Sequence, residues 1–267
     1  MKTLPNTVKD VLDTLMEPVN HVQNTVDTLK AGDPATEVKG IATAFMATQK
    51  VIEQTIALGA NLLITHEGIY FSHHDPAEFL EKDPVYEEKR RIIMGSGLAI
   101  YRFHDYWHRY KPDGIMAGLI QALDWQPHIV ENQPTATILS IPPMTLAEIS
   151  GHIKGRLGIR YLRFAGDLSM KCTRIGLLAG YRGGGSLCIP LYEQENLDLI
   201  IYGEGPEWET PEYVRDANNQ GKQRNLIVLG HAESEEPGMS YLAQSLQTMF
   251  PSIPTYFIPV EQALQVL

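Results

Sequence analysis

Apolar and polar residues follow one another along this chain in segments of two kinds. Short apolar runs are typical of buried strands, and longer segments with an apolar residue every three or four positions are typical of helices. In the first half, the pattern predicts helices over residues 5–16, 48–58, 84–94 and 119–123, and strands over residues 38–46, 61–65 and 98–103. This alternation is typical of βαβ units with a largely parallel sheet.

A second α/β unit begins after a proline-containing stretch at residues 127–134. Here the pattern predicts strands over residues 136–142, 161–166, 173–180, 197–203 and 225–230, and helices over residues 145–157, 186–195, 210–220 and 237–249. A last strand at 256–260 is expected to return to the first sheet. We therefore predict an α/β fold of two domains with mixed, largely parallel sheets: residues 1–126 plus about 233–267, and about 127–232.

Capping signals mark the ends of three predicted helices. Asn6 or Thr7 is placed to cap the first helix, and Gly59 is placed to end the second. Thr145 and Glu148 have the spacing of a capping box, in which side chain and backbone satisfy each other at a helix start.

Composition narrows the class of protein. The chain has 267 residues, of which 43% are hydrophobic, and 32 Asp and Glu against 22 Lys and Arg give a net charge of −10. An acidic chain without a Lys/Arg cluster is unsuited to bind nucleic acid, whose affinity depends on phosphate neutralisation. We find no apolar run long enough for a membrane span and no secretory signal pattern, and two cysteines are too few for a disulfide framework. These features predict a globular cytoplasmic protein with neither nucleic acid nor membrane as partner.

Three apolar strands are each followed by a histidine and a carboxylate. The first leads into His66 and Glu67, the second into His104, Asp105 and His108, and the third into His231, Glu233 and Glu235. Ligands of open α/β sheets bind outside the carboxyl ends of the strands. Imidazole and carboxylate groups are ligands for Zn, Mn, Fe or Ni. The pattern indicates a metal site, although sequence spacing alone does not show that the three strand ends converge.

Two pairs in this set have helical spacing. His104 and His108, like His231 and Glu235, lie four residues apart and share one face if each segment is helical. One pair can share a metal, or two pairs can hold neighbouring metals. A single histidine after a strand is, by contrast, ordinarily a capped or solvated loop residue.

Other polar residues are open to two interpretations. Glu204 follows another strand and either reaches the same site or is a solvated loop carboxylate. His73 and His74 lie in a polar loop, and we leave them out of the predicted site.

The segment LLAGYRGGGS (177–186) resembles a phosphate-binding loop, because it is rich in glycine and follows a strand. It lacks the Lys-Ser/Thr ending of a Walker motif. We expect Gly183, Gly184 and Gly185 to permit a tight strand-to-helix turn with positive φ. No G-x-S-x-G motif supports a serine hydrolase.

Taken together, these segments resemble the NIF-three-like proteins, also called GTP cyclohydrolase I type 2 homologues. The stretch AGDPATEVKGIATAFMATQKVIEQTIALGANLLITHEG (31–68) is similar to the N-terminal half of that family, which leads to its "LLITHH" motif. IGLLAGYRGGGS (175–186) with LDLIIYGEG (197–205) resembles the glycine-rich segment and following strand, and LIVLGHAESE (226–235) resembles the closing G-H-x-x-x-E motif. The resemblance implies two α/β domains with a dinuclear metal site in the crevice between them, and a toroidal homohexamer.

The resemblance also implies roles for single residues. His66 matches the first histidine of the family pair, His104 matches the histidine of the middle H-x-x-x-D motif, and His231 with Glu235 matches the closing motif. Two positions depart from the pattern. Glu67 stands where the family usually has a second histidine, and His108 stands where it has a bridging aspartate.

These departures leave three possibilities for the site. Glu67 becomes the bridging carboxylate, Asp105 takes that role, or only one metal binds. We favour a rebuilt site for two divalent ions (Zn, Mn or Fe) on His66, Glu67, His108, His231 and Glu235, with His104 as a further ligand or a partner of one, and with Glu235 or Glu67 bridging. A glutamate in place of a histidine favours harder ions such as Mn or Fe.

These ligands predict a metal-dependent hydrolase for a small polar or anionic molecule. The family's name implies that this molecule is a nucleotide, whose purine ring is opened as by a GTP cyclohydrolase. Two divalent ions against Glu67 and Glu235 leave a charge of about +2, which favours an anionic substrate. Glu204 or Asp105 is a candidate to move protons. The alternative is a non-catalytic metal-binding or scaffold protein that forms a ring-shaped oligomer.

Overall fold

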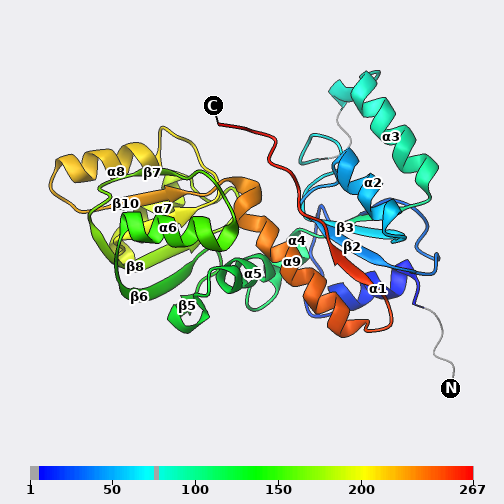
Figure 1. The fold of residues 1–267 in the computed structure, drawn as a ribbon, viewed down its shortest axis with the longest axis horizontal. Coiled ribbons are helices and arrows are strands. Elements are labelled where there is room, and N and C mark those ends of the chain that lie inside the picture. The colour runs from blue at the N-terminus through cyan, green and yellow to red at the C-terminus, as the bar shows by residue number, and fades with distance from the viewer. Residues whose placement is uncertain (1–5, 75–77, 267) are drawn as a thin grey trace. The chain divides into compact units, whose positions relative to one another are not determined.

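The computed structural model describes residues 6–74 and 78–266, which divide into two compact units. The first unit contains the described residues up to Gly114 together with Met239–Glu261. The second contains Ile115–Gly238 and the residues from Gln262 onward. Figure 1 shows the elements of both units and labels those for which there is room. Residue 5, where the first predicted helix begins, lies outside the described residues, and the predicted domain boundaries near residues 126 and 232 stay a prediction.

Five strands form the sheet of the first unit, in the order β1-β4-β3-β2-β11. They are Leu29–Ala31 (β1), Ile41–Ala44 (β2), Leu62–Thr65 (β3), Ala99–Arg102 (β4) and Thr255–Phe257 (β11). β1 is antiparallel to β4, and the other neighbours are parallel. β11 pairs with β2, as expected for a last strand that returns to the first sheet.

Helices cover both faces of this sheet, which is why β2, β3 and β4 are buried throughout. On one face, α2 (Gln49–Ala57) and α3 (Pro84–Ser96) join a core cluster that includes Ala42, Ala44, Leu63, Ile100, Val51, Ile52 and Ile93. On the other face, the hydroxyl of Thr43 donates to the Met239 carbonyl in α9 (His231–Met249), and that of Tyr101 donates to Met16 Sδ in α1 (Val8–Met16). Figure 1 shows α1 and α2 on opposite sides of the sheet.

Six strands form the sheet of the second unit, in the order β5-β6-β8-β9-β10-β7. They are Ile129–Asn132 (β5), Thr137–Thr145 (β6), Arg163–Ala165 (β7), Lys171–Leu178 (β8), Leu199–Tyr202 (β9) and Asn225–Val228 (β10). β8, β9 and β10 are parallel, whereas β5, β6 and β7 pair antiparallel with their neighbours.

The remaining helices are short. They are α4 (Asp105–Arg109), α5 (Gly114–Ala122), α6 (Leu146–Leu157), α7 (Gly185–Gln194) and α8 (Thr210–Asn219), with the 3-10 turns Glu78–Leu80 and Gln126–His128. α7 and α8 contribute Cys188, Tyr192 and Val214 to the core cluster of the second unit. None of the helices in the described part of the chain combines the length and the apolar character needed to cross a membrane.

The structure confirms the mixed α/β fold with two sheets. The capping predictions also hold, because Thr7 caps α1, Thr145 and Glu148 form a capping box on α6, and Gly59 follows α2 with φ of 73°. Several predictions differ. The pattern predicts neither β1 nor α4, and α5 begins at Gly114, five residues before the predicted start at residue 119. β5 lies within residues 127–134, which we expected to be a connection, and α9 begins at His231, six residues before the predicted start at residue 237.

Candidate metal centre

The carboxyl ends of β3 and β4 place two histidines side by side. These strands are parallel neighbours with Thr65 opposite Arg102, so the residues that follow them leave the same edge of the sheet. His66 comes directly after β3, and His104 comes two residues after β4. Their rings are stacked, with centroids 4.5 Å apart and planes 27° apart.

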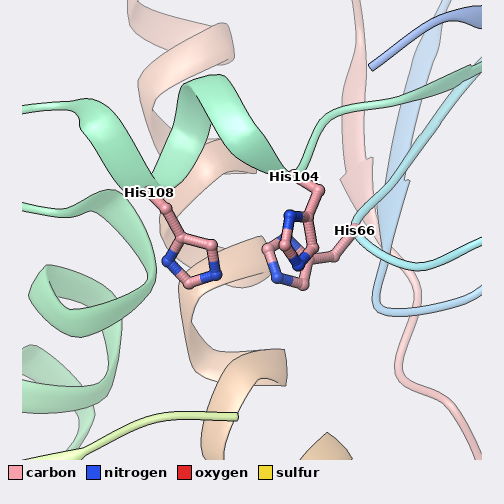
Figure 2. A group of neighbouring side chains, drawn as sticks. All are labelled: His66, His104 and His108. Carbon is pink, nitrogen blue, oxygen red and sulfur yellow. The ribbon is translucent and has the colours of Figure 1, made fainter. Parts of the chain in front are cut away.

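A helical turn brings a third histidine to the same place. α4 begins after His104, and the His108 amide donates to the His104 carbonyl at 3.1 Å. The His108 ring lies 4.9 Å from that of His66 and 5.0 Å from that of His104, centroid to centroid. Each of the three offers one ring nitrogen, and these nitrogens lie within 4.8 Å of one another. Figure 2 shows this three-histidine cluster, His66, His104 and His108.

Each ring of the three-histidine cluster is held at Nδ1 by an oxygen acceptor. The acceptors are the Phe103 carbonyl for His66 at 3.3 Å, Asp105 Oδ1 for His104 at 3.1 Å and Asp113 Oδ2 for His108 at 2.9 Å. Carbonyls and carboxylates only accept, so Nδ1 carries the proton in each ring and Nε2 carries the lone pair that can bind a metal. Metal-binding histidines are oriented in this way by carbonyls and carboxylates. The donor set therefore fits a divalent ion.

Two aspartates link the start of α4 to residues 25–27, because each carboxylate accepts hydrogen bonds from the other segment. The Asp27 carboxylate accepts from the backbone amides of residues 104, 105 and 106 at 2.8, 3.0 and 2.9 Å. In return, Asp105 Oδ2 accepts from the Thr25 hydroxyl at 2.9 Å and the Val26 amide at 3.1 Å. Burial raises the pKa of Asp27, and the three amides oppose that rise. The pKa of Asp105 is lowered, because the bonds from Val26, Thr25 and His104 outweigh its desolvation.

Glu67 lies beside the cluster and pairs with a buried arginine. Its Oε1 is 3.9 Å from His104 Nε2, and its Oε2 accepts from Arg102 Nη2 at 2.7 Å. His73, which the sequence led us to leave out, has its Nδ1 3.8 Å from Glu67 Oε2 and 3.1 Å from Arg102 Nη2. Burial and, second, the Arg102 charge lower the pKa of His73. In the predicted loop 72–76, residues 75 and 76 lie outside the described residues.

The second unit carries the other predicted ligands. His231 and Glu235 lie one turn apart in α9, and His231 Nε2 is 3.1 Å from Glu235 Oε2. His231 Nδ1 is 2.9 Å from Glu204 Oε2, so Glu204 orients this ring as the acids of the first unit orient theirs. His231 follows β10 of the second sheet, whereas His66 and His104 follow strands of the first. The three strand ends thus belong to two sheets, with His66, Glu67, His104 and His108 in the first unit and His231 and Glu235 in the second.

The glycine-rich segment serves close packing. The expectation of positive φ at Gly183–Gly185 is wrong, because Gly184 has φ of −64° and the left-handed residue is Gly180, with φ of 68°. A Cβ on Gly183 would lie 2.7 Å from the Glu204 carbonyl oxygen, so the loop after β8 needs a glycine to pass the loop after β9. The start of α7 is occupied by a carboxylate of the chain itself, since Gly185 donates its amide to Glu209 Oε2 at 2.5 Å. We therefore set the phosphate-binding interpretation aside.

Sequence reasoning missed four residues that hold the first unit's ligands: Asp27, His73, Arg102 and Asp113. Only Arg102 gave a usable signal. It is a charged residue within the apolar strand LAIYRF, and a buried charge in a strand needs a partner close by. Asp27 acts across 77 residues, which no local pattern encodes, whereas Asp113 lies only five residues from His108.

Comparison with known proteins gives the same family that the motifs suggested. The model of the family described as Duf34/NIF3 (NGG1p interacting factor 3) matches residues 6–263. A protein of Chlamydia pneumoniae named GTP cyclohydrolase 1 type 2 homolog is 40% identical over 239 residues, covering 86% of this chain and 87% of that one. One of the same name from Clostridium perfringens is 25% identical over 241 residues, 87% of each chain.

A solved structure shows the same fold. The crystal structure of a Bacillus cereus protein related to NIF3 matches with a TM-score of 0.79 at 15% identity, and covers 99% of this chain and 100% of that one. At this identity the likeness concerns the fold alone.

Proposed function

Because the chain belongs to the Duf34/NIF3 family, we propose that it is a metal-dependent hydrolase acting on a small polar or anionic molecule. The observation that carries this proposal is the three-histidine cluster, in which every ring has its Nδ1 on an oxygen acceptor. Such anchoring is found where imidazoles hold metals and is unneeded for solvated loop histidines.

Two ligand sets support two divalent ions per chain. His66, His104 and His108 would hold one ion in the first unit, and His231 with Glu235 would contribute to holding another. An ion held by these residues would supply Lewis-acid activation of water and of the bond that is attacked. Asp105 is engaged with three donors, so its role in this proposal is to orient His104. Glu204, whose side chain is 47% exposed, is the candidate to move a proton between His231 Nδ1 and a bound molecule.

The name of the curated relatives suggests the first substrate to test. They are called GTP cyclohydrolase 1 type 2 homologs, so we propose GTP and then other nucleotides and small phosphoesters. A ring-shaped homohexamer stays a prediction of the sequence resemblance, and a cytoplasmic location stays a prediction of the composition.

Metal content is the measurement that tests the proposal. The protein would be purified without chelator or affinity metal, and metal per chain would be measured by plasma mass spectrometry. We expect two ions in the wild type, the loss of one in His104→Ala, and the loss of the other in His231→Ala. His21→Ala, which removes an exposed histidine, is the matched control and keeps both.

Turnover then separates an enzyme from a binding protein. The hydrolase is supported if the wild type hydrolyses GTP, another nucleotide or a small phosphoester, and if this activity is lost in His104→Ala. Bound metal without turnover of any compound would favour the metal-binding scaffold, and an absence of metal from the wild type would contradict both.

A further inference from the structure

Arg102 is a fully buried cation at the edge of the three-histidine cluster. Its side chain has 0% exposure, and a guanidinium keeps its proton in proteins. A buried charge of this kind requires an opposite charge and hydrogen-bond acceptors for its donors. A carboxylate that serves as this opposite charge is thereby engaged with the guanidinium.

The guanidinium meets those requirements through the segment that follows β3. Nη2 donates to Glu67 Oε2 at 2.7 Å, Nε donates to the His66 carbonyl at 3.1 Å, and Nη1 donates to the His73 carbonyl at 2.5 Å. Arg102 thus fixes the backbone at both ends of residues 66–73. A second buried cation acts within the same segment, because Lys89 Nζ donates to the Ile69 carbonyl.

We propose that Glu67 is the counter-ion of Arg102 and not a metal ligand, so that the three-histidine cluster binds its ion through imidazoles alone. This inference rests on the proposed metal binding. Glu67 carries one negative charge, and Arg102 already neutralises it at hydrogen-bond distance. A divalent ion on the same carboxylate would add two positive charges directly beside the buried guanidinium, where Glu67 is the only carboxylate that bonds to it in the described part of the chain.

The proposal reverses the metal preference expected from the sequence. A carboxylate in place of the family's second histidine predicts harder ions such as Mn²⁺. A site of three neutral imidazoles prefers Zn²⁺ or Co²⁺ and retains open coordination positions, as catalytic zinc sites do. Arg102 then pairs with Glu67 and holds the backbone at His66, and it takes no part in the ligand set.

The test uses Co²⁺, whose visible absorption reports its ligands. The full chain carrying His231→Ala would serve as parent, so that the ligand pair of the second unit is broken. Into it we would introduce Glu67→Gln, the pair Glu67→Gln with Arg102→Gln, and His104→Ala. The pair removes both charges together and therefore avoids an uncompensated buried guanidinium if the single variant does not fold.

We expect the parent, Glu67→Gln and the double variant to bind one Co²⁺ with the same band positions and with dissociation constants within about threefold of one another. His104→Ala should lose the bands. Shifted bands, or binding weakened about tenfold or more in the folded double variant, would make Glu67 a ligand and overturn the inference. A parent without Co²⁺ bands would instead contradict the proposed three-histidine site itself.

Discussion

At His108, one carboxylate determines which ring nitrogen carries the proton. Asp113 Oδ2 lies 2.9 Å from Nδ1, and both side chains are nearly buried, at 12% and 11% exposure. The same arrangement recurs at His104 with Asp105 and at His231 with Glu204. An imidazole held by a carboxylate is a more basic and better oriented ligand than one in solvent.

This geometry predicts the effect of removing the acid. Asp113→Ala should weaken Zn²⁺ binding by about 10- to 100-fold, because His108 loses the group that fixes its ring and tautomer. Asp113→Asn should recover part of that loss, since the amide oxygen still accepts a hydrogen bond. Competition with a chromophoric chelator would measure both. Asp13→Ala, which removes an exposed acid on α1, should bind Zn²⁺ like the wild type, and equal binding by Asp113→Ala would refute the orienting role.

At the scale of elements, the short helix α4 is stabilised at its N-terminus by Asp27, which is distant in sequence. The helix has five residues, and His104 at its N-cap makes no side-chain capping bond. Asp27 supplies the missing acceptor to three backbone amides. Trp107 secures the other side of the helix against Tyr110 and Tyr241, with ring centroids 4.7 and 6.1 Å away. The cap and the aromatic packing together hold His104 and His108 one turn apart.

Asp27→Ala should therefore affect stability and metal binding together. Leaving buried amides without an acceptor should lower the free energy of unfolding by about 1–3 kcal/mol. It should also weaken Zn²⁺ binding, because His104 and His108 lose their shared support. Urea denaturation of the metal-free protein and a Zn²⁺ titration would measure the two effects.

The matched control for Asp27 is Thr145→Ala, which removes the capping box of α6. It should cost about 1 kcal/mol of stability with no change in Zn²⁺ affinity. If Asp27→Ala behaved like this control, the cap would be structural only.

At the scale of the whole molecule, buried acids limit stability at alkaline pH. Burial raises the pKa of the Cys172 thiol to about 11 and that of Cys188 to about 12, and it raises the pKa of the Tyr110 and Tyr202 phenols to about 12. In the unfolded chain these groups lose their protons earlier, with thiols near 9 and phenols near 10. Rising pH therefore favours the unfolded chain.

We expect the thermal midpoint to be nearly level below about pH 8.5 and to fall progressively from about pH 9 toward pH 11. Differential scanning calorimetry across this range would measure the fall. Cys188→Ala removes one of the raised groups, so its slope should be shallower than that of the wild type even if its midpoint is lower throughout. A steeper or unchanged slope would contradict the assignment of Cys188.

The sequence predicts most helices and strands, and it predicts the histidines at the carboxyl ends of β3 and β4, because periodicity and capping are local. Thr7 and Thr145 mark helix starts through residues three positions away, and the apolar runs mark β3 and β4. Asp105 and Asp113 are close in sequence to the histidines they hold, but other partners in the site are not. Asp27 lies 77 residues from His104, and Arg102 lies 35 from Glu67, so only the folded chain brings them together. α9 begins early because its first turn is polar, which hides it from a search for apolar spacing.

The counter-ion of Arg102 also changes the charge expected at the site. Two divalent ions and the carboxylates of Glu67 and Glu235 give a net charge of about +2 only if neither carboxylate neutralises another cation. Arg102 adds a positive charge that sequence spacing did not reveal, while Asp105 and Asp113 add negative charges behind the histidines. The electrostatic environment of the cluster is therefore set as much by these partners as by the ligands.

The varied anchors of the histidines have a consequence for engineering. A designer who grafts His66, His104 and His108 onto another scaffold transfers the ligands without the carbonyl and the two acids that hold their rings. The smallest transferable module comprises residues 25–27, 66–73 and 102–113, three pieces that are separated in sequence. Since residues 102–113 hold both of the other pieces, through Asp105 and Arg102, such a graft succeeds only as a whole. A library that varies the histidines alone searches the wrong positions.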